Sequence, residues 1–155
     1  YEEVLIEAHR QLVSLEDLDT ILQSDVVPEE KLRAFLQRIL HTAASSSELW
    51  GMKIYLREMA SPSSFVTKTM TTTVLPKAAK LKALVGELTG LPEDSPRLQR
   101  ATGLVVVPCI SMIMFPESLR SVVLPGTVAT PEDMLEDMMA YMLGGLKALG
   151  DIPRS

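Results

Sequence analysis

The chain has 155 residues, of which 46% are hydrophobic and 23% charged, with 15 Lys and Arg against 20 Asp and Glu and a net charge of −5. This length suits one domain with a buried core, and the apolar fraction excludes intrinsic disorder. The single cysteine excludes an internal disulfide framework and any multi-cysteine metal site. The acidic balance argues against these residues binding nucleic acid by charge.

The apolar runs and the N-terminus indicate the compartment. The longest apolar run, Leu104–Phe115, is shorter than the roughly 20 residues that span a bilayer. The acidic start Tyr1–Val4 carries no secretion signal. We therefore expect a cytoplasmic protein with no membrane partner. Because a helical pattern is already under way at a first residue that is not Met, we also expect the chain to begin inside a longer protein.

The first half of the chain reads as helices. Apolar residues recur at three- and four-residue spacing from Leu5 to Leu22, which predicts one long first helix. Pro28, followed by two glutamates, predicts the start of the next helix, which the serines at 45–47 end. Ser45 and Glu48 have capping-box spacing and predict a further helix over about 48–60.

The stretch Pro62–Thr89 is rich in threonine and is ambiguous by composition. Its β-branched residues would suit a strand, but no second strand is available to pair with it. The pattern therefore favours a helix with a kink at Pro76 and a C-terminal cap at Gly90.

Two long helices close the chain. The first covers Pro96–Phe115, and its nearly all-round hydrophobicity predicts burial on more than one side. The second covers Pro131–Leu149, starts from Thr130 as cap, and is closed by Gly150. The predicted fold class is all-α, a helical bundle of about five to six helices.

No motif for catalysis, metal binding or phosphate binding is present. The chain has no HExxH, GxGxxG, P-loop or GxSxG, and its two histidines stand apart. We therefore expect no enzyme, no metal and no cofactor. The acidic residues Glu16, Asp17 and Asp19 are expected to form a solvated helix face. The lysines at 77, 80 and 82 are also expected at the surface, with phosphate binding as an alternative.

Nine methionines are spread over several predicted helices. Methionine is flexible and fills irregular space, in ordinary cores and in the walls of adaptable binding sites. Both interpretations stand for any one methionine, whereas the set as a whole favours a helix-lined apolar pocket.

Several segments, in this order and spacing, resemble the C-terminal effector-binding and dimerisation domain of TetR-type bacterial transcriptional regulators. The resemblance covers nearly the whole chain, 1–155, and the family's N-terminal helix-turn-helix DNA-binding domain is absent. The segments that carry it are Tyr1–Leu12, Leu56-Arg57-Glu58-Met59 followed by Pro62, Pro76 with Leu81 and Leu84, and Gly90-Leu91-Pro92 with Asp94, Pro96, Arg97 and Leu98.

The resemblance implies a homodimer. The family pairs its last two long helices with their copies as a dimeric four-helix bundle, and here these would be Pro96–Phe115 and Pro131–Leu149. Gly144-Gly145 would allow close approach. The alternative is that the apolar stripe packs only within one chain. The expected interface residues are Leu135, Met138, Met139, Met142, Leu146 and Leu149.

The resemblance also implies an effector pocket between helices. Cys109-Ile110 stand where related chains often have Gly-Gln, so the pocket should be apolar and its ligand a small hydrophobic molecule. Arg57 has ion pairing between helices as its alternative role, and Cys109 has that of an inert core thiol. The expected ligand-binding residues are Trp50, Ile54, Arg57, Met70, Thr73, Cys109, Met112 and Phe115.

The function implied is that of the regulatory domain of a transcriptional repressor. A small hydrophobic effector would change the dimer, and operator DNA would be bound only through the missing N-terminal domain. The alternative is a stand-alone helical dimerisation module, or a carrier of small molecules or lipids, without a role in DNA binding.

Overall fold

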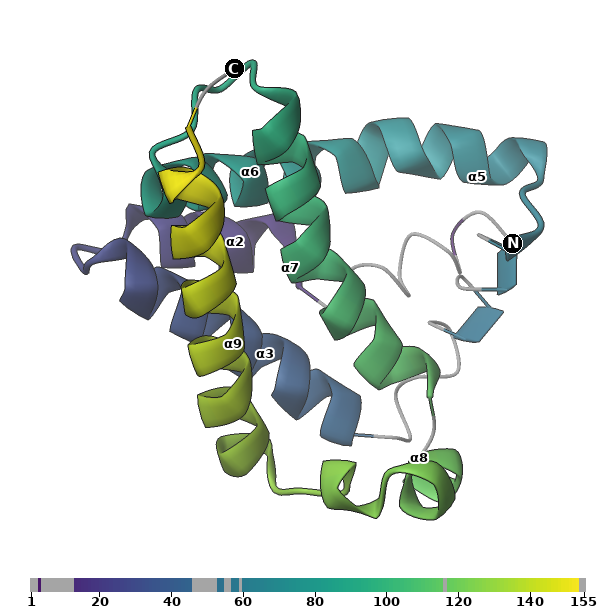
Figure 1. Cartoon of the computed structure of the whole chain (residues 1–155). Helices are drawn as coiled ribbons and strands as arrows, with labels where there is room; N and C mark the ends of the chain where they lie inside the picture. Colours follow the sequence, from purple (N-terminus) through teal and green to yellow (C-terminus); the bar gives the residue numbers. More distant parts are fainter. Residues whose placement is uncertain are drawn as a thin grey trace.

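The computed structural model describes residues 3, 13–45, 53–54, 57–58, 60–115 and 117–153. These residues form an all-α bundle without a strand, as the sequence predicts (Figure 1). The predicted helix over about 48–60 lies mostly outside the described residues. The element order is α2 Leu15–Gln23, α3 Pro28–Ala44, α5 Ser64–Thr69, π-helix η2 Met70–Val74, α6 Leu75–Thr89, α7 Pro96–Met114, α8 Glu117–Val123, 3-10 helix η3 Pro125–Thr127 and α9 Pro131–Asp151.

The predicted long first helix is wrong, because a new helix begins at Leu15. Ser14 has extended backbone and caps α2: its hydroxyl accepts from the Asp17 N–H at 3.0 Å, and its own N–H donates to the Asp17 carboxylate at 3.4 Å. This reciprocal capping box satisfies amides that would otherwise lack partners at the helix start. The apolar residues therefore keep their helical spacing on both sides of Ser14. Only the capping interaction shows that α2 begins there.

Helix α3 runs through the middle of the core and confirms the predicted helix. It starts at Pro28 and ends at the Ser45 cap. Its buried stripe packs against α6, α7 and α9. The buried residues of α3 are Leu32, Phe35, Leu36, Ile39, Leu40 and Thr42.

The threonine-rich segment is helical, as predicted, and contains one turn of π-helix. Helices α5, η2 and α6 follow one another without a break, and η2 ends at Val74, two residues before Pro76. Proline lacks an amide donor and disturbs the helix one turn before it, which accounts for a wide turn at this place. Several threonine hydroxyls in the segment bond back to the carbonyl four residues earlier. Gly90 ends α6 with φ of 69°, the left-handed conformation that favours glycine.

Helices α7 and α9 run in opposite directions along one side of the bundle, and α8 bridges their lower ends (Figure 1). Thr130 caps α9 by accepting from the Asp133 N–H at 3.2 Å, as predicted. Within the single chain, α7 packs against α3, α6 and α9, but it is not covered all round. Leu104 is 59% exposed and Val107 is 62% exposed, so one face of α7 has no cover within the described chain.

The acidic residues of α2 do more than form a solvated face. Asp17 lies 3.6 Å from the Arg38 guanidinium on α3, and Asp19 pairs with Lys80 on α6. Helix α2 is therefore tied to two other helices by charge as well as by its buried Leu18. Such half-exposed pairs contribute modestly to stability, but they define where α2 sits.

Candidate functional site

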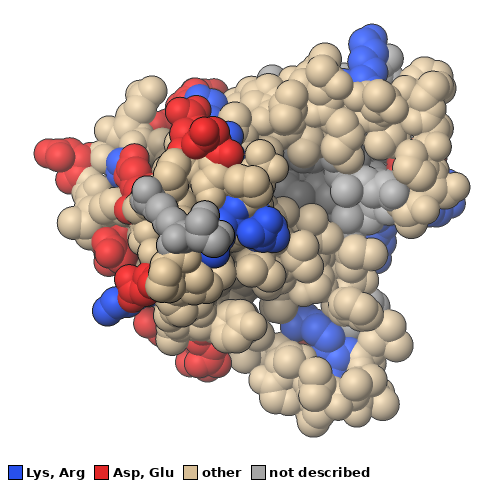
Figure 2. All heavy atoms as spheres, turned by 45° about the horizontal axis from the view of Figure 1, so that its top comes forward, with Lys and Arg blue, Asp and Glu red and all other residues tan. Residues whose placement is uncertain are grey.

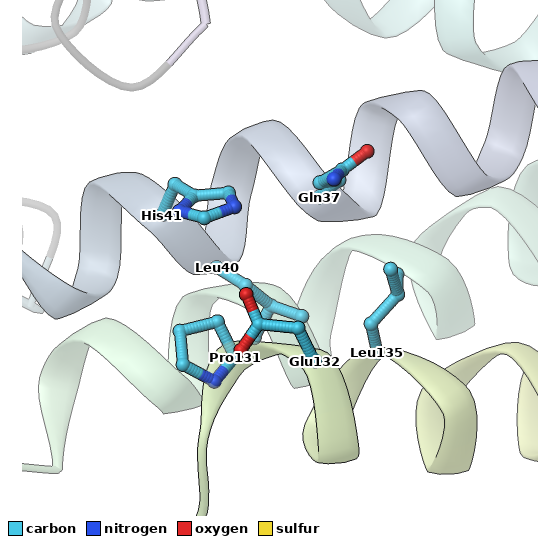
Figure 3. A pocket seen from close by; sticks show the side chains of 6 residues that line it. All are labelled: Gln37, Leu40, His41, Pro131, Glu132 and Leu135. Atoms are coloured by element: carbon cyan, nitrogen blue, oxygen red, sulfur yellow. The ribbon is translucent and has the colours of Figure 1, made fainter.

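Three of the hollows that described residues line differ in size, and the size indicates whether each could hold a ligand. The smallest lies between α3 and α9 (Figure 3). Gln37, Leu40 and His41 come from α3, and the facing side chains belong to the first turns of α9. Its volume is about 10 Å³, which is room for at most one water molecule. This cleft is therefore a packing gap and not a ligand site.

The second hollow lies where the C-terminal ends of α3 and α7 meet α8 and the start of α9; we call it the α7–α8 cavity. Its volume is about 270 Å³, near the lower end of the roughly 300–1,000 Å³ of small-molecule sites. Ten of its 13 lining residues are apolar, and the other three are charged. It is lined by Leu40, Ala43, Ala44, Lys53, Met112, Ile113, Met114, Phe115, Glu117, Arg120, Ala129, Pro131 and Met134.

Arg120 holds the outer wall of this cavity together. Its Nε donates to the Phe115 carbonyl oxygen at 3.1 Å and its Nη1 to the Thr127 carbonyl oxygen at 2.9 Å. These bonds tie the end of α7 to the turn before α9 across α8. The guanidinium is thus held in a defined position at the cavity wall.

The third hollow, the α6–α7 groove, lies on another part of the surface. Its volume is about 290 Å³. Its floor is built from small residues of α6 and two buried leucines, with one lysine and one glutamate beside them. It is lined by Ala79, Lys82, Ala83, Gly86, Leu91, Glu93 and Leu98.

The structure distributes the predicted ligand-binding residues unevenly. Met112 and Phe115 line the α7–α8 cavity. Cys109 is buried in the core, where desolvation raises the pKa of its thiol to about 12, as its alternative role as an inert thiol requires. Trp50 lies outside the described residues. The remaining predicted residues, which line none of these three hollows, are Ile54, Arg57, Met70 and Thr73.

Sequence reasoning missed Arg120 and the contribution of α3. Arg120 is the one basic residue of the short segment Glu117–Leu124, and a basic residue in an apolar-rich segment is a signal that could have been used. Nothing in the apolar period of α3 marks Ala43 and Ala44 as cavity lining, because both belong to the same helical pattern as the core.

The predicted interface residues face the core of their own chain, and their contact with a second chain stays a prediction. Five of them are buried in the core of this chain, and Leu149 packs against that core. The stripe faces inward because α9 packs on α3 and α6. A Cβ at Gly144 or Gly145 would meet no described atom of this chain within 4 Å, so the close approach of a second helix there stays a prediction. The buried five are Leu135, Met138, Met139, Met142 and Leu146.

Two further findings concern the described ranges as a whole. No group of three or more His, Cys, Asp or Glu side chains within them is arranged to hold a metal ion. No single helix among them has the length and apolar composition to cross a bilayer; α7 and α8 reach that composition only together, across a bend of 101°.

An all-α bundle with a cavity where helices meet is an architecture that suits small-molecule binding. The sequence matches a protein family over residues 28–146, and that family is described as "HTH-type transcriptional dual regulator CecR, C-terminal domain". The chain therefore belongs to the CecR C-terminal domain family. This agrees with the resemblance to TetR-type regulators and specifies which family of regulator domains it is. A comparison with curated proteins found no significant match.

Proposed function

We propose that this domain binds a small, largely apolar effector in the α7–α8 cavity and passes the binding event, through a homodimer, to a DNA-binding module outside these residues. The observation that carries the proposal is the cavity itself. It lies in the matched part of a regulator domain, and its walls come from four helices. Any ligand that fills it touches the ends of both α7 and α9.

The apolar lining supports a ligand rather than a solvated gap. Met112, Met114 and Met134 supply flexible side chains that adapt to different shapes. Phe115 is 55% exposed at the same wall, although it is a large apolar side chain. An apolar molecule in this place would remove that surface from water, which is favourable at about 25 cal/mol per Å².

The outward faces of α7 and α9 support a homodimer. Leu104, Val107 and Met114 lie exposed on α7, and Tyr141 on α9 is 79% exposed. An apolar face of this extent is typical of an interaction surface. The interface we propose is thus the opposite side of these helices from the stripe first expected. Gly144 and Gly145 belong to this open side, where they would admit a partner helix closely.

The cavity and the proposed interface share α7 and α9, which suggests how one affects the other. Ligand binding would favour one separation of the α7 and α9 ends, and this separation sets the angle between subunits. Such coupling requires that the ligand bind the two arrangements with different affinity. Whether the regulator represses or activates depends on which arrangement binds DNA.

Fluorescence of phenylnaphthylamine, a neutral apolar probe, tests the cavity. We expect saturable binding to the chain, lost in Met112→Trp, because the indole would fill the cavity. Ala83→Trp is the matched control, since it adds the same side chain to the α6–α7 groove. Circular dichroism verifies that both variants remain helical.

The outcomes separate the proposal from its alternative. Equal loss in both variants, or no saturable binding to the unmodified chain, would favour a dimerisation module without an effector. Binding that resists Met112→Trp would place the probe elsewhere and overturn the assignment of the cavity.

A further inference from the structure

We propose that the ligand of the α7–α8 cavity is an amphipathic anion: an apolar body whose single carboxylate or other oxyanion is held by Arg120 and Lys53. This inference rests on the proposed function and gives it a ligand class. It departs from the sequence-based expectation of a purely hydrophobic molecule.

The first support is the charge of the cavity wall. Its charged side chains are Lys53, Arg120 and Glu117, two positive against one negative. The whole chain, by contrast, carries a net charge of −5. In Figure 2, Lys and Arg atoms lie in the recess beside the lobe formed by α8, whereas Asp and Glu gather mainly on the opposite side of the molecule. The cavity is thus locally positive on an acidic domain.

The second support is the state of Arg120. A guanidinium has five N–H donors, and the Phe115 and Thr127 carbonyls take one each. The ion pairs of the described residues join other side chains, and none includes Arg120 or Lys53. Arg120 is therefore oriented by neutral backbone oxygens, has donors left over, and forms no ion pair with a carboxylate among the described residues.

The third support is the free-energy cost of binding a neutral ligand in this cavity. A neutral apolar ligand in the cavity would displace water from a half-exposed guanidinium without replacing its hydrogen bonds, which costs free energy. An oxyanion on the ligand would replace those bonds with charge-assisted ones, and a planar carboxylate matches the fork of an arginine. Because Arg120 is already held in place, little entropy is lost when the anion binds.

A pair of probes tests this class directly. Anilinonaphthalene sulfonate carries the same fused ring system as phenylnaphthylamine plus one sulfonate, so the two differ mainly in charge. We expect the sulfonate to bind the unmodified chain about tenfold more tightly than the neutral probe, the size of one charge-assisted hydrogen bond. We also expect its affinity, and not that of the neutral probe, to fall as salt is raised.

Lys53→Gln and Arg120→Gln locate the anion. Each should weaken binding of the sulfonate, by about tenfold for Arg120→Gln, and more than it weakens binding of phenylnaphthylamine, which Lys53→Gln should leave within about twofold. Arg120 also ties α7 to the turn before α9, so Lys53→Gln, which breaks no bond within the described residues, keeps the test valid if Arg120→Gln distorts the fold. Lys82→Gln removes the same charge from the α6–α7 groove and should change neither probe.

The result distinguishes this inference from the proposed function. If phenylnaphthylamine binds and Met112→Trp blocks it, while the sulfonate binds no tighter or ignores both glutamine variants, the anionic class is wrong and the cavity stands. If neither probe enters the cavity, the proposed function itself fails. Equal weakening by Lys82→Gln would show a general charge effect and would also overturn the inference.

Discussion

A Cβ atom placed on Gly150 would lie only 2.3 Å from the carbonyl oxygen of Thr89 and 3.1 Å from its carbonyl carbon. The backbone of the last turn of α9 therefore lies against the backbone at the end of α6, and only glycine is small enough to fit there. The sequence pattern predicted Gly150 as the end of the last helix, but α9 continues to Asp151. The residue is needed for a tertiary contact and not as a helix stop.

Gly150→Ala should therefore lower the free energy of unfolding by about 1–3 kcal/mol, the usual cost of overpacking a rigid site. The better helix propensity of alanine, about 1 kcal/mol, offsets only part of this. Urea denaturation measures the difference. Gly144→Ala, in open space on the same helix, is the control and should be neutral or stabilising at matched association state. A Gly150→Ala variant as stable as the control would show that the helices separate freely.

The proposed dimer interface predicts a monomer after Val107→Glu. The side chain is 62% exposed in one chain, so a carboxylate there is tolerated by the fold but would be buried without a partner in the dimer. Sedimentation velocity at micromolar concentration should show the shift to monomer, with the circular dichroism spectrum unchanged. A dimer that survives this substitution would exclude the outer face of α7 as the interface.

Met142→Glu gives the opposite result and separates the two faces of α9. Met142 is 4% exposed and lies in the core of this chain. The free energy needed to bury a charge without a partner is large compared with the free energy of unfolding of a small domain. We expect loss of helical signal and of cooperative unfolding, rather than a folded monomer. A folded, monomeric Met142→Glu chain would restore the inward stripe as the dimer interface.

The ion pair between Arg33 on α3 and Glu136 on α9 predicts a pH dependence. The hydrogen bond from Arg33 holds the pKa of Glu136 below its ordinary 4.5. The folded state thus binds fewer protons than the unfolded state, and the stability from this pair is present above the ordinary pKa and lost as pH falls through the folded value. Glu136→Gln should lower the urea midpoint at pH about 7, and the difference should shrink as the pH falls below the ordinary pKa of 4.5 and through the lower folded value.

Glu87→Gln is the control for this pair, because Glu87 is an exposed glutamate of α6 that the ion pairs among the described residues do not include. If Glu136→Gln and Glu87→Gln respond to pH alike, the α3–α9 pair contributes nothing specific.

The buried Cys109 thiol should resist modification in the folded chain. Its pKa of about 12, against an ordinary 9.0, lowers the thiolate fraction at pH about 8 by roughly 10³-fold, and the thiolate is the reactive form. An aromatic disulfide reagent should therefore react slowly with the native chain and rapidly in urea. Native and unfolded rates within a factor of about ten would mean that Cys109 is reached by frequent local opening.

Much of the fold follows from local pattern. Pro28, Gly90 and Thr130 mark helix ends through the backbone chemistry of a few neighbouring residues, and the structure confirms all three. The threonine-rich segment was resolved as helix by the lack of a strand to pair with. The start of α2 after Ser14 was not predicted, because the apolar spacing continues past this residue. The capping box that marks the start depends on only one hydroxyl and one carboxylate.

The candidate site could be predicted only in part. Met112 and Phe115 were predicted because they lie near the C-terminal end of the apolar run in α7. Arg120, Ala43 and Lys53 come from three separate segments, and no periodicity along the chain relates them. Their shared cavity forms where the chain bends by 101° between α7 and α8, near the end of α3.

The amphipathic period determines that α9 has an apolar stripe, since that depends only on 3.6 residues per turn. It does not determine which surface the stripe covers. Met138 and Met142 would suit a second chain as well as α3, because burial of apolar area is not directional. In the tertiary structure the stripe packs into the chain's own core, because α3 and α6 contact the inner side of α9. Leu104, Val107 and Tyr141 are left exposed.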